Sequence, residues 1–407
     1  MKKKIKAGIQ SVRNHGRLIF AGLMFVLLSV ALILKEFQES KRVGLPSVQS
    51  GPWGDMLVWD IKIQQPEEYL GFFKLSSEGP FWNFGQASEK TVEHALSSSG
   101  CSVALVRQLL DSRVAPGNDD FVIRPPEKLL LSLDKKTRAN LYLKLANNPK
   151  NFYQANPILV PGGNFTQLLH GQIQNPERIQ GMYQRLCYDR NGYTYFSDPE
   201  VILRALDQDP KEREAFLKFL TTIRAVMASI LVKPETEIDL PVMYWGLATP
   251  GLRIKDLYPL FEAQKSLPGG GAIPVSSLLP ERARVSLYKT PLASSNHEAP
   301  PDCHFAALSF FSSNPDPRFA DTNFVAQYLA NNYYEIGKPS LTGDLVMLVN
   351  SRNVLVHTGV HLAGDIVYSK NGANIGQPWV LMREKDMVGL FSALEPVNIR
   401  YMRWNRL

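Results

Sequence analysis

The chain has 407 residues, 44% of them hydrophobic and 20% charged, which is typical of a globular protein long enough for two or three domains. Six of its 45 basic residues and none of its acidic ones lie within residues 1–17, so 39 basic residues face 38 acidic ones in the rest of the chain. The net charge of +7 therefore comes from the N-terminal tail, and the nearly neutral body does not support a general nucleic-acid-binding surface.

An uncharged apolar run at residues 18–34 follows this basic tail. As a helix, such a run would rise about 25 Å, close to the ~30 Å hydrocarbon core of a bilayer. The run predicts a single-pass transmembrane signal anchor, and the basic residues before it place residues 1–17 in the cytoplasm and the body outside. A cleaved signal peptide is the alternative, but the residues after the run, Leu-Lys-Glu-Phe at 34–37, are a poor cleavage site. Residues 35–50 are predicted to form a polar stalk.

Residues 51–291 are predicted to form a mainly helical domain, to which the sequence assigns no role. Ser88 and Asp134 are suited to cap helices at their N-termini, and Gly100 suits a left-handed position after a helix end. Pro210 fits the first position of a helix. Apolar residues from 216 to 230 then recur at helical spacing, which predicts one helix running to about residue 232.

The remainder, residues 292–407, is predicted to be an α+β domain in which a helix packs on an antiparallel sheet. The domain is expected to begin with a loop at 292–301. Helices are expected at 303–311, 323–333 and 384–394, and strands at 344–349, 354–363, 365–369, 379–383 and 397–404, with a tight turn at 363–365.

Three polar residues of this last domain suggest a nucleophilic site. Cys303 follows Asp302 in the first turn of a helix, where unpaired backbone N–H groups and the helix dipole stabilise a thiolate. His357 lies on a strand as the candidate base, and Asn371 follows the next strand, where an amide could orient the imidazole. The alternatives are a buried, inert Cys303 and an Asn371 that serves only the turn it makes with Gly372.

Four other groups are weaker candidates. His304 projects away from Cys303 around the helix and is expected to line a substrate site, as is His361, while Tyr288 is a candidate second oxyanion donor. His357 and His361 would be roughly 13 Å apart on a strand, too far to share a metal, and we expect neither a metal site nor a cofactor. Cys101 and Cys187 are expected to be small buried residues, although a disulfide between them stays open.

The order of these motifs resembles the NlpC-type cell-wall peptidases of the papain-like superfamily. The resemblance rests on Asp-Cys at 302–303, Gly-Asp-Leu-Val at 343–346 and the His-x-Gly strand at 357–364, and covers about residues 300–375. It implies Cys303 as the nucleophile, His357 as the base, and a third polar group near residues 370–371. The chain differs from the family in having His304 and Phe305, in place of Ser-Gly, after the cysteine.

The predicted function is therefore a membrane-anchored, extracytoplasmic cysteine peptidase or amidase. The resemblance implies amide bonds of peptidoglycan stem peptides as its substrate, cleaved through a thioester. Two alternatives stay open: an acyltransferase with the same residues, and a catalytically silent module that binds envelope proteins.

Overall fold

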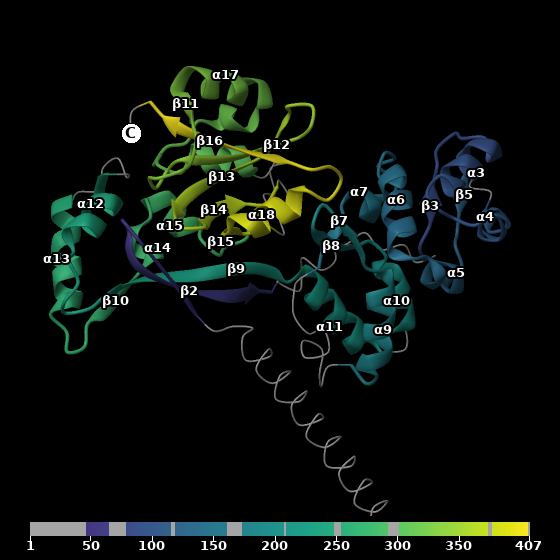
Figure 1. Cartoon of the computed structure of the whole chain (residues 1–407), viewed down its shortest axis with the longest axis horizontal. Coiled ribbons are helices and arrows are strands. Elements are labelled where there is room, and N and C mark those ends of the chain that lie inside the picture. The colour runs from purple at the N-terminus through teal and green to yellow at the C-terminus, as the bar shows by residue number, and fades with distance from the viewer. Residues whose placement is uncertain are drawn as a thin grey trace, which may run out of the picture. The chain divides into compact units, whose positions relative to one another are not determined.

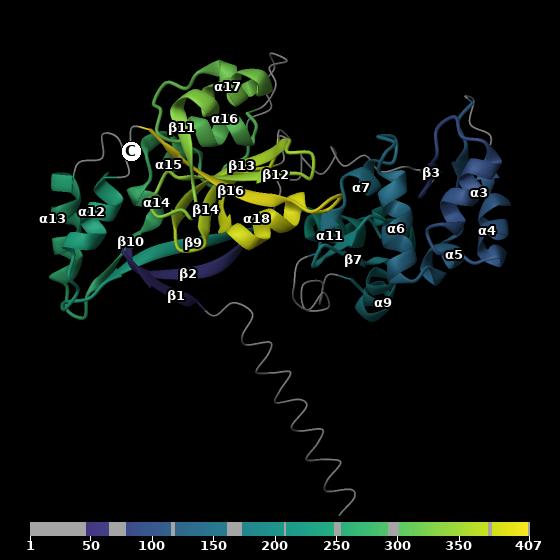
Figure 2. The same ribbon diagram turned by 45° about the horizontal axis from the view of Figure 1, so that its top comes forward.

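The computed structural model describes residues 46–64, 79–114, 119–160, 173–206, 209–247, 254–291, 301–372 and 377–405. These residues have an α+β fold with several antiparallel sheets (Figures 1 and 2). From Ser47 onward the chain forms one compact unit.

The sheet that carries the predicted site has six strands in the order β11-β16-β12-β13-β14-β15, and every neighbouring pair is antiparallel. Its strands are β11 (Tyr333–Ile336), β12 (Leu345–Val349), β13 (Leu355–Ala363), β14 (Ile366–Lys370), β15 (Trp379–Arg383) and β16 (Asn398–Trp404). Five of them confirm the predicted strands to within one residue at each end, and β11 has no predicted counterpart. β13 and β14 are interior strands, so nearly all of their residues are buried.

Helices cover both faces of this sheet, as Figure 2 shows. The helices are α16 (Cys303–Leu308), η1 (Pro317–Ala320), α17 (Thr322–Asn332) and α18 (Glu384–Phe391). Phe310, just after α16, lies 5.3 Å from the ring of Tyr368 on one face. Met387 of α18 packs with Leu348 and Val367 on the other. Because successive residues of a strand point to opposite faces, each residue of β13 and β14 lies either on the face that carries α16 or on the face that carries α18.

A second sheet, in the order β1-β2-β9-β10, corrects the predicted helix that ran to about residue 232. Helix α11 (Pro210–Thr221) ends first, and β9 (Ile223–Val232) pairs along its length with β2 (Gly54–Ile63); the outer strands are β1 (Ser47–Gly51) and β10 (Gly271–Pro274). Residues 223–232 are so rich in apolar residues that helical spacing and alternation both fit them. Pairing with a strand about 170 positions earlier in the sequence decides between the two.

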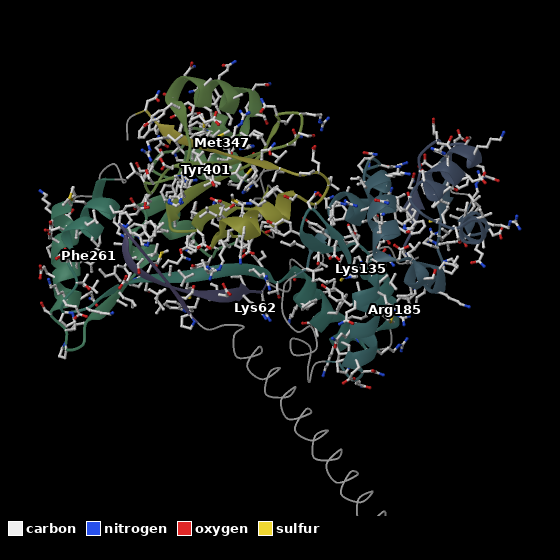
Figure 3. The ribbon with its side chains drawn as sticks, in the orientation of Figure 1. Lys62, Lys135, Arg185, Phe261, Met347 and Tyr401 are labelled. Atoms are coloured by element: carbon white, nitrogen blue, oxygen red, sulfur yellow. The ribbon has the colours of Figure 1, made fainter. Side chains whose placement is uncertain are left out.

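The two sheets share one apolar core. Val226 and Ile230 of β9 lie in the same buried cluster as Leu345 of β12 and Val360 of β13, so this core draws on residues from both sides of position 291. Phe261, labelled in Figure 3, joins it from α13. The helices of this region are α12 (Asp239–Leu247), α13 (Ile254–Lys265), α14 (Val275–Leu278) and α15 (Glu281–Ser286).

The region before β9 has its own core and two small sheets, of order β3-β5-β4 and β6-β8-β7. Ser88 and Asp134 cap α3 and α6 as predicted, Gly100 has the predicted positive φ of 110°, and Pro210 begins α11. The elements are α3 (Glu89–Ser97), α4 (Val103–Leu110), α5 (Glu127–Ser132), α6 (Lys135–Leu145), α7 (Phe152–Ala155), α9 (Pro176–Leu186) and α10 (Pro199–Ala205), with strands β3 (Trp82–Asn83), β4 (Arg113–Val114), β5 (Val122–Ile123), β6 (Ile158–Leu159), β7 (Tyr188–Arg190) and β8 (Tyr193–Phe196).

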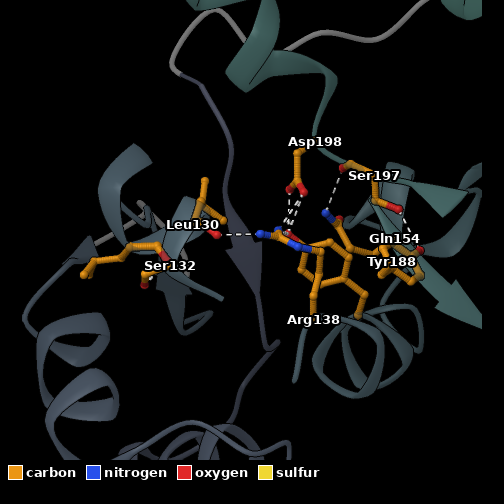
Figure 4. A network of polar contacts seen from close by, with 9 residues as sticks. Leu130, Ser132, Arg138, Gln154, Tyr188, Ser197 and Asp198 are labelled. Atoms are coloured by element: carbon orange, nitrogen blue, oxygen red, sulfur yellow. Dashed lines mark hydrogen bonds and ion pairs between the residues drawn. The ribbon is translucent and has the colours of Figure 1, made fainter. Parts of the chain in front are cut away.

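A fully buried ion pair crosses this core (Figure 4). The Arg138 guanidinium of α6 donates to Asp198 Oδ2 at 3.0 Å, to Tyr142 Oη at 2.8 Å and to the carbonyl of Leu130. Tyr142 in turn donates its hydroxyl to Asp198 at 2.7 Å. The network ties α6 to α5 and to the start of α10, because a buried charge is tolerated only when it is paired and hydrogen-bonded.

The predicted fold needs one further correction. Among the residues that the structure describes, the predicted transmembrane helix is not found, since no helix there is long and apolar enough to cross a membrane. The run at 18–34 on which that prediction rested lies outside the described residues, as do the tail at 1–17 and most of the predicted stalk.

Candidate functional site: a buried thiol and a histidine on opposite faces of one sheet

Cys303 occupies the first position of α16. Asp302 caps this helix by accepting the backbone N–H of Phe305 at 2.8 Å, as its place before the cysteine predicts. The thiol is buried, and its pKa is raised to about 11 by that burial and by the Asp302 carboxylate. Hydrogen bonds from the backbone of Thr358, His304 and Cys303 itself act in the opposite direction and lower the pKa of the thiol. The effect of burial is the larger, so at neutral pH the thiol keeps its proton.

His304 faces the same strand as Cys303. Its Nδ1 lies 2.9 Å from the hydroxyl of Thr358 on β13, and both side chains are buried. Burial lowers the pKa of His304, so its imidazole is neutral at pH 7. This residue anchors the first turn of α16 to β13 next to the thiol.

Lys370, at the end of β14, is a charged group that the motif-based prediction did not assign. It follows Tyr368 by two positions and therefore projects to the α16 face of the sheet. The ammonium group donates to the carbonyl of Gly372 at 2.7 Å and lies 5.6 Å from the centre of the Trp379 ring. Burial lowers the pKa of Lys370 to about 8; a thiolate at Cys303 and the carboxylate of Asp302 would each act in the opposite direction. A lysine at the end of an otherwise apolar strand is the sequence signal that could have revealed it.

His357 lies on the other face of the sheet. Its imidazole stacks on Phe391 of α18, with ring centres 3.9 Å apart and an angle of 18° between the rings. Nε2 of His357 is 2.9 Å from Ser369 Oγ, and Ser369 donates its hydroxyl hydrogen to Asn371 Oδ1 at 2.9 Å. Since Ser369 has only that one hydrogen, Nε2 must be the donor to Ser369.

The proton on Nε2 leaves the lone pair of His357 on Nδ1. That nitrogen is buried and has no hydrogen-bond partner among the residues that the structure describes. Burial holds the pKa of His357 well below its usual value, with the neighbouring His304 acting in the same direction. Asn371, the predicted third polar group, is linked to His357 through Ser369 and not directly.

The structure brings these residues together as two groups. Cys303, His304, Thr358 and Lys370 belong to the α16 face, while His357, Ser369 and Asn371 form a separate relay. Thr358 and His357 are consecutive on β13 and therefore face opposite sides. No hydrogen bond joins Cys303 to His357 in this part of the described chain.

The two remaining predicted site residues have structural contacts of their own. His361 lies near the end of β13 that is farther from His357, and its backbone N–H donates to the carbonyl of Asp344. Burial lowers the pKa of its imidazole to about 4. Tyr288 has a φ of 61° and joins two sheets, because its N–H donates to Trp379 of β15 and its hydroxyl to Val226 of β9 at 2.5 Å.

Cys101 and Cys187 are both buried free thiols, and burial raises their pKa values to about 11 and about 12. Among the described residues, no three His, Cys, Asp or Glu side chains are grouped closely enough to hold a metal ion. Comparison of the chain with family models, characterised proteins and solved structures finds no match.

Proposed function

We propose that the chain is a thiol-dependent hydrolase of amide bonds in which Cys303 is the nucleophile. The observation that carries this proposal is the place of Cys303 in the first turn of α16, where backbone N–H groups have no partner within the helix, on a sheet face that also holds the buried Lys370. Donors of this kind stabilise a thiolate and the oxyanion formed when it attacks a carbonyl. The resemblance to cell-wall peptidases gives the substrate class, amide bonds in stem peptides of peptidoglycan.

The proton of Cys303 needs an acceptor, and we assign that role to Lys370. His357 was the base expected from the sequence, but it faces α18 rather than α16. Transfer of the thiol proton to a neutral Lys370 amine creates an ammonium–thiolate pair in which each charge stabilises the other. The thiolate then attacks the amide carbon, and the departing amine takes the proton from Lys370. Water hydrolyses the thioester, which releases the acid and restores the thiol.

The pH dependence of alkylation at Cys303 tests this assignment. Iodoacetamide labelling of the full chain, with peptide mass spectrometry to separate the three cysteines, is expected to accelerate as the pH rises through about 8, where Lys370 loses its proton. Lys370→Met removes the opposite charge and should slow labelling at pH 8 by about 10-fold or more, because such a charge shifts a pKa by one to three units. Lys289→Met, at an exposed lysine, is the matched control.

His357→Gln separates the two candidate bases. Under the proposal this variant labels at nearly the unchanged rate. If His357→Gln slows labelling and Lys370→Met does not, the acceptor is His357 and the role given to Lys370 is wrong. Turnover is then measured as new carboxylate in stem-peptide fragments, with Cys303→Ala as the inactive reference; activity in that variant would refute the thiol mechanism.

A second candidate is a binding module without turnover. Two observations favour it: the raised pKa of Cys303 and the separation of Cys303 from His357 by the sheet. It predicts that Cys303 labels like an ordinary buried thiol in the unchanged chain and in the Lys370→Met and His357→Gln variants alike, and that no thioester forms on it with any stem-peptide fragment.

A further inference from the structure

The C-terminal end of α18 receives its hydrogen-bond donors from a distant part of the chain. α18 ends at Phe391 and has no basic residue in its last turn. The last carbonyls of a helix lack partners within the helix and need donors from elsewhere. Here Asn191 donates to the carbonyl of Ser392, the C-terminal cap of the helix, at 2.7 Å, and Arg190 donates to that of Ala393, one residue beyond the cap, at 2.7 Å.

Two tyrosines of the same β7–β8 hairpin bind further back along the helix. The Tyr195 hydroxyl donates to the carbonyl of Gly389 at 2.7 Å, within the buried interior, and Tyr193 donates to that of Lys385 at 2.9 Å. Gly389 allows this approach, because a Cβ there would lie 2.6 Å from the Tyr193 ring. The guanidinium of Arg190 also places a positive charge at the end of α18 where the helix dipole is negative.

The opposite side of α18 holds the imidazole of His357. Phe391, the last residue of the helix, provides the ring on which His357 stacks. One turn earlier, Met387 packs so closely on β13 that a Cβ at Gly359 would lie 2.9 Å from its sulfur. A shift of α18 along or away from the sheet would therefore move the ring that covers His357.

We infer that the β7–β8 hairpin is a positioning element for His357, acting through α18 and Phe391. Arg190, Asn191, Tyr193 and Tyr195 are the positioning residues. The hairpin fixes the end of α18, Phe391 fixes one ring face of His357, and Ser369 with Asn371 fixes its Nε2. The inference gives the region before β9 a role that the sequence did not assign, and it does not depend on Cys303 being a nucleophile.

The test reads the state of the His357 ring directly. The full chain is labelled at histidine with ¹⁵N and ¹³C, and the ring resonances are compared among variants, with His357→Gln used to assign the signal. Tyr195→Phe removes only a hydroxyl, and Gly389→Ala pushes the helix from the hairpin. Both should shift or broaden the His357 signals, because the Phe391 ring that covers the imidazole moves with the helix. Phe391→Leu should produce the same change from the other side of the helix.

Two internal references make the result decisive. Tyr258→Phe removes a hydroxyl bonded to Asp239, away from α18, and should leave the His357 signals unchanged. The His361 signals should stay fixed in every variant. The inference is overturned if Tyr195→Phe and Gly389→Ala leave His357 unchanged while Phe391→Leu moves it. It is equally overturned if His361 shifts as much as His357, because the effect would then be a general loosening of the fold.

Discussion

Removal of Asp198 is expected to be among the most destabilising single changes in the region before β9. Asp198→Leu would leave the Arg138 guanidinium charged and fully buried, with only the Tyr142 hydroxyl and the Leu130 carbonyl as partners. Within the described part of the chain, Nε of Arg138 already lacks a hydrogen-bond partner. Removing one member of a buried ion pair costs about 3–5 kcal/mol of unfolding free energy, because the other charge stays desolvated.

The same helix provides a matched control. Lys135 of α6 forms an ion pair with Asp189 of β7 at 3.4 Å, but these side chains are 58% and 59% exposed. Water screens such a pair, so Lys135→Met should cost no more than about 1 kcal/mol. The double variant Arg138→Met with Asp198→Leu removes both buried charges and should recover most of the loss of the single variant.

Urea unfolding of the full chain, followed by tryptophan fluorescence, measures these differences. Trp82 is suited as a reporter, because its ring lies 6.2 Å from that of Tyr142 in the same core. With a typical slope of about 1–3 kcal/mol per molar urea, Asp198→Leu should lower the midpoint of the transition by at least about 1 M. A loss no larger than that of Lys135→Met, or a double variant no more stable than Asp198→Leu, would refute this account of the pair.

Three further predictions concern other parts of the structure, and urea unfolding tests each of them. His361 has a pKa of about 4 in the folded chain against 6.5 in the unfolded chain, so its protonation favours unfolding as the pH falls from 6.5 to about 4. His361→Gln should therefore remove up to roughly 3 kcal/mol of acid destabilisation and change the unfolding free energy little above pH 7. Gly359→Ala should cost about 1–3 kcal/mol of unfolding free energy, because its Cβ would lie 2.9 Å from the Met387 sulfur. Adding Met387→Ala to the same chain should relieve that overlap, and a double variant that shows no relief would contradict the close packing of Met387 on Gly359. Gly100→Ala should cost about 1–2 kcal/mol of unfolding free energy, since the φ of Gly100 is 110° and a Cβ there would lie 2.8 Å from the Thr137 hydroxyl. The control is Gly181→Ala, inside a helix with open space around the new Cβ, which should cost nothing.

Much of the local structure could be predicted because it depends on neighbours in the chain. The caps at Ser88, Asp134 and Asp302 require only a short polar side chain and the backbone N–H groups two or three residues later. Strands β12 to β16 follow alternating or continuous apolar runs bounded by turn residues, which is why their predicted ends agree with the structure. The placement of Cys303 in the first turn of a helix was predicted on the same local grounds.

The sequence by itself determined where α16 begins and where strands β12 to β16 lie, but only the tertiary structure decided which residues meet. β9 became a strand because β2 pairs with it, a contact that no local pattern contains. β13 and β14 are buried on both faces, so their apolar pattern does not reveal which residues face α16 and which face α18. Packing set Thr358 and Lys370 toward α16 and His357 toward α18, and a shift of one residue would have reversed that choice. The physical reason is that strand residues alternate faces, whereas the faces themselves are defined by helices distant in sequence.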